Sequence, residues 1–242
     1  MKPTLFLSDL HLAPDRPAAT AAFHAFTRGP ARAAAAVYIL GDLFDAWIGD
    51  DQLREPLAST IGASLRALSA SGVALYVARG NRDFLLGEAF AQSVGATLLP
   101  EQQIVDVGDL RFLVLHGDEL CTDDADYQAY RTRMRSAASR RRLRALPYTI
   151  RRGIAWYLRR KSRAANLLKP EAIMDVTPAA VDEMFRRHAV TRMIHGHTHR
   201  PARHMLDLDG QSRERIVLAA WEDRGHYLEV SSAGIHVRDV TG

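Results

Sequence analysis

The sequence predicts a layered α/β domain that carries a separate helical segment, and three patterns of side chains lead to this fold class. Short apolar runs alternate with longer helical patterns in the first half. Stretches that alternate polar and apolar residues follow Pro201, and a helical, arginine-rich stretch lies between these two parts. The 242 residues suffice for one large domain with an insertion, and the apolar and charged fractions of 47% and 25% are those of an ordinary soluble protein.

The strands and helices of the predicted body follow from these runs. Short, continuous apolar runs predict buried strands at Thr4–Ser8, Val37–Leu40, Val73–Ala78 and Phe112–Leu115. Helical patterns fill the gaps between them, at Ala18–Phe26, Leu53–Ala70 and Leu85–Ser93. Near the end of the chain, alternating stretches indicate an antiparallel sheet packed onto the first one, at Arg215–Ala219, His226–Val230 and Ile235–Val237. Two packed β-sheets flanked by helices are therefore expected.

A basic helical segment interrupts this body. From Tyr127 to Pro170 there are 14 Lys or Arg residues and no Asp or Glu, which leaves 18 basic and 28 acidic residues in the rest of the chain. Apolar residues three and four apart predict one helix face formed by Leu143, Leu146, Ile150, Ile154 and Tyr157, and Pro147 is expected to begin a new helix. We expect residues 125–170 to form a helical cap on a body of residues 1–124 and 171–242.

The role of this cap is open to two interpretations. A charge difference this sharp indicates an anionic partner, such as a phosphate, a nucleic acid or an acidic membrane surface. The alternative is a helical hairpin that packs on the body and exposes its basic face to solvent. No apolar run approaches the length needed to span a bilayer, and we expect no signal peptide because Thr4–Leu7 is too short. Cys121 is the single cysteine, so an internal disulfide is excluded, as suits a reducing cytoplasm.

Five short polar motifs each follow an apolar, strand-like run. They are Asp9-Leu10-His11, Gly41-Asp42, Gly80-Asn81-Arg82-Asp83, His116-Gly117-Asp118 and Gly196-His197-Thr198-His199. Because ligands of α/β sheets bind at the carboxyl ends of strands, we expect the five loops to converge on one place.

The residue types of these motifs suit metal ions. Carboxylate oxygens together with imidazole nitrogens fit manganese, iron or zinc better than magnesium or calcium. Asp9 and His11 would share one side of an extended chain, and so would His197 and His199. Asp42 has two oxygens and can bridge two ions, which at about 3.5–4 Å apart would clamp a phosphate and lower the pKa of a water between them.

Each motif alone is weak evidence, since Asp-x-His and Gly-Asp occur by chance and His-x-His can be two surface histidines. The ordered set of five resembles the calcineurin-like metallophosphoesterase superfamily, whose sandwich fold would match the two packed sheets. This resemblance implies one ion held by Asp9, His11, Asp42 and His199, and a second held by Asp42, Asn81, His116 and His197. Asp42, Asn81, His116 and His197 would also be the catalytic set. Asp83 and Asp118 are expected to orient ligands, while His195 is left out.

Longer stretches resemble one family within this superfamily, the UDP-2,3-diacylglucosamine hydrolases of lipid A synthesis. The most specific of them are residues 41–51, 80–87, 116–124, 172–176 and 194–201, and Arg82 stands where many superfamily members have His. This resemblance implies manganese-dependent attack of water on the α-phosphorus of the UDP group. The products would be UMP and 2,3-diacylglucosamine 1-phosphate. It also implies a peripheral protein on the cytoplasmic face of the bacterial inner membrane, with a monomer as the expected oligomeric state.

The same family implies a set of substrate contacts. They match Asn81, Arg82, Asp124, Ser162, Asn166, Lys169 and His197 here, and Tyr127 is added as an aromatic residue at the base of the cap. The apolar face of the cap, with Trp156 and Tyr157, would shelter the acyl chains, and its basic face would lie on anionic lipid headgroups.

Two other functions compete with this one. The first is a soluble nucleotide or phosphodiester hydrolase with a basic cap. The second is a nucleic-acid-binding protein that works through its arginine-rich segment. Few aromatic residues are interleaved with these arginines, and no standard DNA-reading motif is present, so no nucleic-acid partner is expected.

Overall fold

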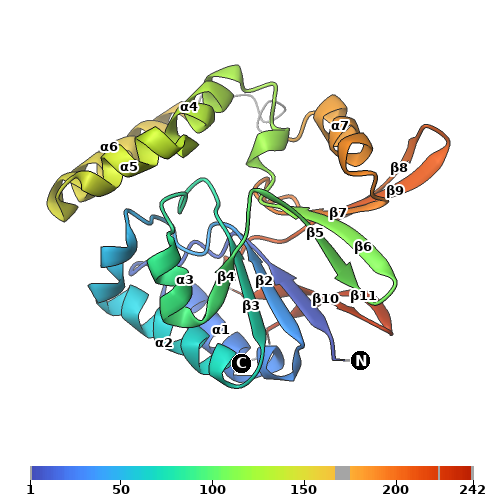
Figure 1. The fold of residues 1–242 in the computed structure, drawn as a ribbon, viewed down its shortest axis with the longest axis horizontal. Coiled ribbons are helices and arrows are strands. Elements are labelled where there is room, and N and C mark those ends of the chain that lie inside the picture. The colour runs from blue at the N-terminus through green and yellow to red at the C-terminus, as the bar shows by residue number, and fades with distance from the viewer. Residues whose placement is uncertain (1, 167–174, 223, 241–242) are drawn as a thin grey trace.

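The fold is an α/β sandwich with a helical cap, as Figure 1 shows for the computed structural model of the chain. The structure describes residues 2–166, 175–222 and 224–240, and the side chains of 161–166 are outside this description. None of the described helices is long and apolar enough to cross a membrane. The strands are β1 (Thr4–Leu7), β2 (Ala36–Leu40), β3 (Ala74–Ala78), β4 (Ala96–Leu98), β5 (Gln102–Val107), β6 (Leu110–Leu115), β7 (Arg192–His195), β8 (Ala202–Leu208), β9 (Gln211–Val217), β10 (His226–Ser231) and β11 (Gly234–Asp239).

The helices fall into a group on the body and a group in the cap. Those of the body are α1 (Pro17–Arg28), α2 (Pro56–Ala70), α3 (Glu88–Val94) and α7 (Pro178–His188). Those of the cap are α4 (Ala125–Arg135), α5 (Ala137–Ala145) and α6 (Tyr148–Asn166). Three short 3₁₀ helices complete the described elements, at η1 (Pro30–Ala33), η2 (Asp50–Arg54) and η3 (Asp118–Leu120). α2 begins at Pro56 rather than at the expected Leu53, because the preceding residues form η2 and a proline occupies the first turn.

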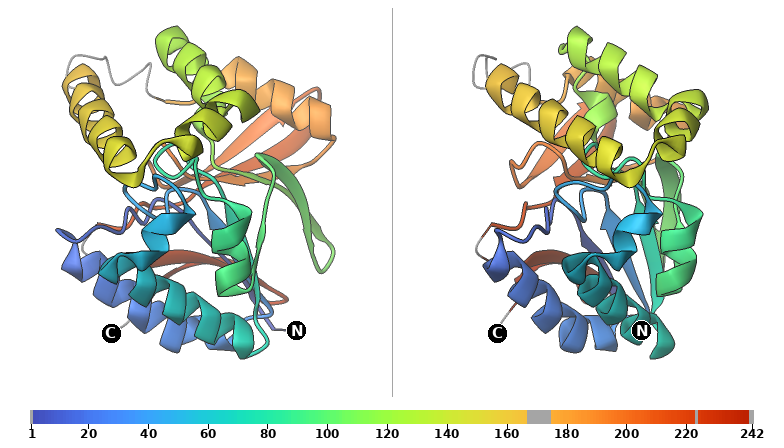
Figure 2. Two further views of the ribbon diagram at one scale, coloured as in Figure 1. Left: turned by 60° about the vertical axis from the view of Figure 1, so that its left-hand side comes forward. Right: turned by 90° about the vertical axis from the view of Figure 1, so that its left-hand side faces the viewer.

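The two sheets have the orders β11-β10-β1-β2-β3-β4 and β5-β6-β7-β9-β8. The apolar side chains between them form one core, which includes Phe6, Tyr38 and Phe112. A second core lies between the first sheet and α1–α3, and a third lies beneath α7 on the second sheet. Helices therefore cover both outer faces of the sandwich, and the two views of Figure 2 show the same layers.

The C-terminal strands do not form the separate antiparallel sheet that their pattern predicts. β10 and β11 are an antiparallel hairpin, but β10 pairs with β1 and so extends the first sheet. β9 pairs in parallel with β7 and antiparallel with β8 in the second sheet. Alternation of polar and apolar residues predicts a strand with one buried face, but it does not say which sheet the strand joins.

The cap helices lie over the loops at the carboxyl ends of β1, β2 and β3 (Figure 1). The chain turns at Leu146-Pro147, so α5 ends before this pair and α6 begins at Tyr148, as Pro147 predicts. The expected single apolar face is therefore divided. Leu143 packs against the core of the body, whereas Ile150 and Tyr157 are exposed.

Candidate metal centre

Seven potential ligands come together at the ends of five strands from both sheets. Asp9 and His11 follow β1, Asp42 follows β2 and Asn81 follows β3, all in the first sheet. In the second sheet, His116 follows β6, and β7 precedes the pair His197 and His199. The expected convergence of the five loops is therefore seen, although it occurs across two sheets rather than along one.

Five of these seven residues have a left-handed backbone. The φ angles are 55° at Asp9, 47° at His11, 52° at Asp42, 70° at His197 and 55° at His199. Positive φ is uncommon outside glycine, and clusters of it mark functional sites where the surrounding structure holds the strain. The expectation that Asp9 and His11 share one side of an extended strand is wrong, because the chain has already left β1 and coils around the site.

Ligand atoms of Asp9, His11 and His199 form one compact group. They lie within 4.8 Å of one another, as do those of a second group formed by Asp9, Asp42 and His116. Nε2 of His11 is 3.1 Å from Nε2 of His199, so at most one of these nitrogens carries a hydrogen. Oδ1 of Asp9 is buried and has no hydrogen-bond partner among the described residues, although it is 3.5 Å from Nε2 of His199. A buried carboxylate oxygen without a hydrogen-bond donor is a favourable ligand for a cation, whose positive charge would balance it.

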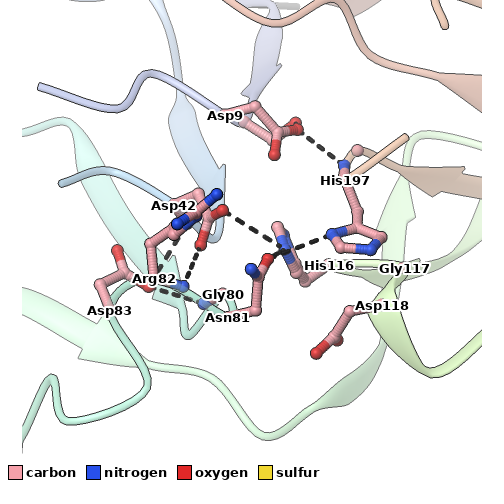
Figure 3. Close-up of polar contacts among 12 residues, drawn as sticks. Asp9, Asp42, Gly80, Asn81, Arg82, Asp83, His116, Gly117, Asp118 and His197 are labelled. Atoms are coloured by element: carbon pink, nitrogen blue, oxygen red, sulfur yellow. Dashed lines mark hydrogen bonds and ion pairs between the residues drawn. The ribbon is translucent and has the colours of Figure 1, made fainter. Parts of the chain in front are cut away.

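Asp42 lies between the two halves of the cluster. Its Oδ2 is 3.8 Å from Nε2 of His11 and 3.8 Å from Nε2 of His116. Its other oxygen, Oδ1, accepts a hydrogen bond of 2.8 Å from the backbone N–H of Arg82 (Figure 3). One oxygen thus fixes the side chain, and the other faces ligands on both sides.

Asn81 joins the remaining two histidines. Its Oδ1 is 3.0 Å from Nε2 of His116 and 3.1 Å from Nδ1 of His197 (Figure 3). Nδ1 of His116 lies 2.9 Å from the carbonyl oxygen of Leu40, which can only accept, so this nitrogen carries a hydrogen and Nε2 faces the cluster. The donors are thus two carboxylates, four imidazoles and an amide oxygen, a set that fits transition-metal cations.

Buried carboxylates hold the loops behind the ligands. Asp83 accepts hydrogen bonds from the backbone N–H groups of Gly80, Asp42 and Leu43, at 2.7, 3.3 and 2.9 Å. Asp9 is held in the same way, since its Oδ2 accepts from Ser8 Oγ at 2.6 Å and from the N–H of His197 at 2.8 Å. A side chain at position 196 would collide with Ser8 and Asp9, so glycine is required there.

Charge interactions within the cluster shift the pKa values of its members. Burial lowers the pKa of His11 to about 3 and that of His197 to about 4, so both imidazoles are neutral at pH 7 and able to ligate. Burial alone would lower the pKa of His116 as well, but attraction by Asp42 and Asp9 raises it to about 9. Burial raises the pKa of Asp42 to about 7. The cluster therefore holds protons that a bound cation would displace.

The residues that were expected to contact the substrate do not all lie at one place in the structure. Asn81, Arg82 and Tyr127 line a cavity of about 490 Å³ between the body and the cap. Oδ1 of Asp124 accepts a hydrogen bond from the N–H of Tyr127 and caps α4. Lys169 lies outside the described residues, and so do the side chains of Ser162 and Asn166.

Two members of the expected apolar face of the cap, Leu143 and Ile154, line this cavity. Leu158, Phe84 and Leu85 also line it and were missed from the sequence. Trp156, by contrast, lines an adjoining cavity of about 630 Å³, and Tyr157 lines neither. Phe84 and Leu85 lie in the stretch 80–87, which indicates the family but does not place a cavity.

Comparisons with known proteins place this chain among the phosphoesterases. A family model described as calcineurin-like phosphoesterase matches residues 2–201. A protein from Cellvibrio japonicus named UDP-2,3-diacylglucosamine hydrolase is 47% identical over 236 residues, covering 98% of each chain. One of the same name from Yersinia enterocolitica is 48% identical over 229 residues, covering 95% of each. A solved phosphoesterase from E. coli is 14% identical with a TM-score of 0.47, covering 98% of this chain and 93% of its own.

Proposed function

Since the chain belongs to the calcineurin-like phosphoesterase family, and its relatives at 47% and 48% identity are named UDP-2,3-diacylglucosamine hydrolases, we propose that it hydrolyses the pyrophosphate bond of UDP-2,3-diacylglucosamine. Water attacks the α-phosphorus, and the products are UMP and 2,3-diacylglucosamine 1-phosphate. This is a step of lipid A synthesis.

The observation that supports this substrate best is the cavity beside the metal centre. Asn81 and Arg82 line it beside the metal centre, and apolar side chains from the cap and the body, such as Ile154, Leu158 and Phe84, line it as well. Four more charged residues also take part in the lining, namely Asp45, Asp126, Arg151 and Arg159. A pyrophosphate joined to acyl chains likewise combines a charged and an apolar part. A soluble nucleotide or a nucleic-acid strand would leave the apolar part of this cavity unused.

The metal centre is proposed to hold two manganese ions. Asp9, His11, Asp42 and His199 would hold one, and Asp42, Asn81, His116 and His197 the other. When bound, such ions neutralise phosphate charge and activate water. Oδ1 of Asp9, which has no hydrogen-bond partner in the described part of the chain, and the short distance between His11 and His199 support this set. Arg82 adds a cation at the cavity end of the centre, where it would orient the phosphate groups.

The cap is proposed to rest on an anionic membrane surface. Ile150, Trp156 and Tyr157 on α6 are 49%, 63% and 60% exposed, and Arg152 and Arg160 beside them are exposed as well. Exposed aromatic and basic side chains on one helix suit the headgroup region of a bilayer. The protein would thus work as a monomer bound to the cytoplasmic face of the inner membrane, with residues 125–170 as its lipid-facing part.

The decisive experiment is an assay for UMP. Purified protein with manganese should release UMP from UDP-2,3-diacylglucosamine in mixed micelles, and EDTA should abolish the release. Cyclic nucleotides and DNA serve as competing substrates in the same buffer. Good turnover of either one without UMP release would exclude the proposed reaction.

A further inference from the structure

One buried carboxylate anchors the first helix of the cap to the metal centre. Asp118 is fully buried and lies two residues after His116. Three donors from α4 reach the same oxygen, Oδ2: the hydroxyl of Tyr127 at 2.8 Å, Nε of Arg131 at 3.0 Å and Nη2 of Arg135 at 2.7 Å. The donors are four residues apart, so they form one stripe along the helix.

Further contacts hold α4 in the same position. Gln128 donates to the backbone carbonyls of Asp118 at 2.8 Å and Cys121 at 3.0 Å. Arg131 and Arg135 also bind Glu101, at 2.8 and 3.2 Å. Burial raises the pKa of Asp118, but attraction by Arg135, His116 and Arg131 outweighs it and holds that pKa well below its usual range. The carboxylate is therefore charged, and charge-assisted hydrogen bonds of this kind are stronger than neutral ones.

Tyr127 makes a second link between α4 and the metal centre. Its ring stacks on the imidazole of His197, with centroids 6.1 Å apart and planes inclined by 21°. The imidazoles of His197 and His116 are themselves in contact, with centroids 5.1 Å apart. Through Asp118 and Tyr127, α4 thus reaches both histidines of the ion site that also contains Asn81.

The other ion site has no such link. Among the described residues, His11 and His199 contact each other, Asp9 and Asp42, and neither has a hydrogen bond, ion pair or ring contact with α4. The two sites therefore differ in their dependence on the cap, although they share Asp42.

We propose that Asp118 and Tyr127 are positioning residues through which the seating of the cap sets the affinity of one ion site, the site of Asn81, His116 and His197. The affinity of the site of His11 and His199 is independent of α4. This inference rests on the two-ion centre of the proposed function. Tyr127 also lines the cavity, so a substrate bound there contacts a side chain that holds a metal ligand.

The test is a manganese titration of metal-free protein, without substrate, followed by calorimetry and by the electron paramagnetic resonance of free manganese. His199→Ala and His116→Ala identify which binding step belongs to which site. Tyr127→Leu removes both the ring and the hydroxyl, Tyr127→Phe removes the hydroxyl alone, and Arg135→Met removes one donor. Arg133→Met is the matched control, because Arg133 lies on α4 and is exposed.

We expect Tyr127→Leu to weaken the site of His116 by about tenfold and to leave the site of His199 unchanged, since partners of metal ligands typically contribute factors of 10–100. Arg135→Met should weaken the same site by a smaller factor, because Arg135 contacts Asp118 and not a ligand. Tyr127→Phe should have a smaller effect on the same site. The inference is overturned if both sites keep wild-type affinity in these variants, or if both weaken equally, as a general loss of stability would cause. The wild-type titration by itself tests the two-ion centre, so the two failures are distinguishable.

Discussion

Arg151 in α6 forms an ion pair with Asp51 in η2, with Nη1 of the arginine 2.9 Å from Oδ1 of the aspartate. The same guanidinium also donates to the carbonyl oxygens of Ile48 and Leu146, at 2.5 and 3.0 Å. The basic cap is thus attached to the acidic body by specific contacts. Arg159 with Asp45, and Arg144 with the carbonyls of Leu85 and Leu86, add to this attachment.

Replacement of Arg151 should loosen the cap. The side chain is only 7% exposed. Arg151→Met therefore removes the hydrogen bond to the buried carbonyl oxygen of Ile48 and the ion pair with the carboxylate of Asp51. Because Asp51 is itself 36% exposed and can be hydrated, we expect a loss of about 2 kcal/mol in the free energy of unfolding. This corresponds to a decrease of about 4–8 °C in Tm, measured by calorimetry. Arg142→Met, on the exposed face of α5, is the control and should change Tm by less than about 2 °C.

These contacts show what the sequence could and could not predict about the basic segment. The charge asymmetry predicts an anionic partner, and for Arg131, Arg135, Arg151 and Arg159 that partner is the acidic body itself. Charge counting gives the sign of the partner but not its location. Pairs such as Arg151 and Asp51 are 100 residues apart and leave no local pattern. The arginines that remain exposed on α6 are the ones available to a membrane.

The ligands of the metal centre could be predicted from the sequence, whereas the pairing of the strands could not. Each ligand motif is local, and each follows an apolar strand, so the rule that sites form at strand ends sufficed to bring Asp9, Asp42 and His116 together. The pairing of β10 with β1 joins segments more than 200 residues apart, which no periodicity encodes. The left-handed backbone at Asp9 and His199 was also unpredictable, since strain of this kind is maintained by the tertiary structure.

Metal ions should stabilise the protein through Asp42. Ions that bind only the folded state add about 2.7 kcal/mol at 100 times their Kd, which raises Tm by about 5–10 °C. Asp42→Ala should abolish this increase and nearly all activity, because Asp42 faces both groups of ligands. Glu183→Gln, an exposed substitution on α7, should respond to manganese as the wild type does. A full manganese-dependent increase in the Asp42→Ala protein would contradict the bridging role.

Metal binding should release protons from the centre. In the metal-free protein at pH 7.5, His116 is protonated because its pKa is about 9, while His11 and His197 are already neutral. A ligating imidazole must lose its extra proton, so we expect release of about one proton per chain at this pH. Titration calorimetry in buffers of different ionisation enthalpy measures this number. The release should fall as the pH rises through 9. It should be much smaller in His116→Gln, where only the fraction of a proton held by Asp42, with its pKa of about 7, remains to be displaced. Equal heats in all buffers would refute the assignment.

Glu119 should make the folded protein less stable at alkaline pH. Burial and, to a smaller extent, repulsion from Asp118 raise the pKa of this side chain to about 7, well above its ordinary value of 4.5. The folded protein therefore holds the proton more tightly than the unfolded chain does. This contribution to stability is complete below pH 4.5 and is lost as the pH rises towards 7. Glu119→Gln should thus exceed the wild type in stability at pH 8, by at most about 3 kcal/mol, and match it at pH 4. Urea unfolding at both pH values measures this, and an equal difference at the two would argue against a buried, titrating Glu119.

The apolar cavity gives a prediction about substrate selectivity. Ile154 lines it from α6, whereas Ile150, one turn earlier on the same helix, is exposed and does not line it. Ile154→Trp should fill part of the space that the proposal assigns to acyl chains. Each methylene group that loses its apolar surroundings costs about 0.8 kcal/mol, so exclusion of two or three of them should lower kcat/KM for the diacylated substrate by about tenfold or more.

Turnover of a short-chain analogue should change much less, because its chains end before the filled region. Ile150→Trp adds the same side chain outside the cavity and should leave the ratio of the two kcat/KM values unchanged. If Ile154→Trp lowers kcat/KM equally for long-chain and short-chain substrates, the cavity does not hold the acyl chains.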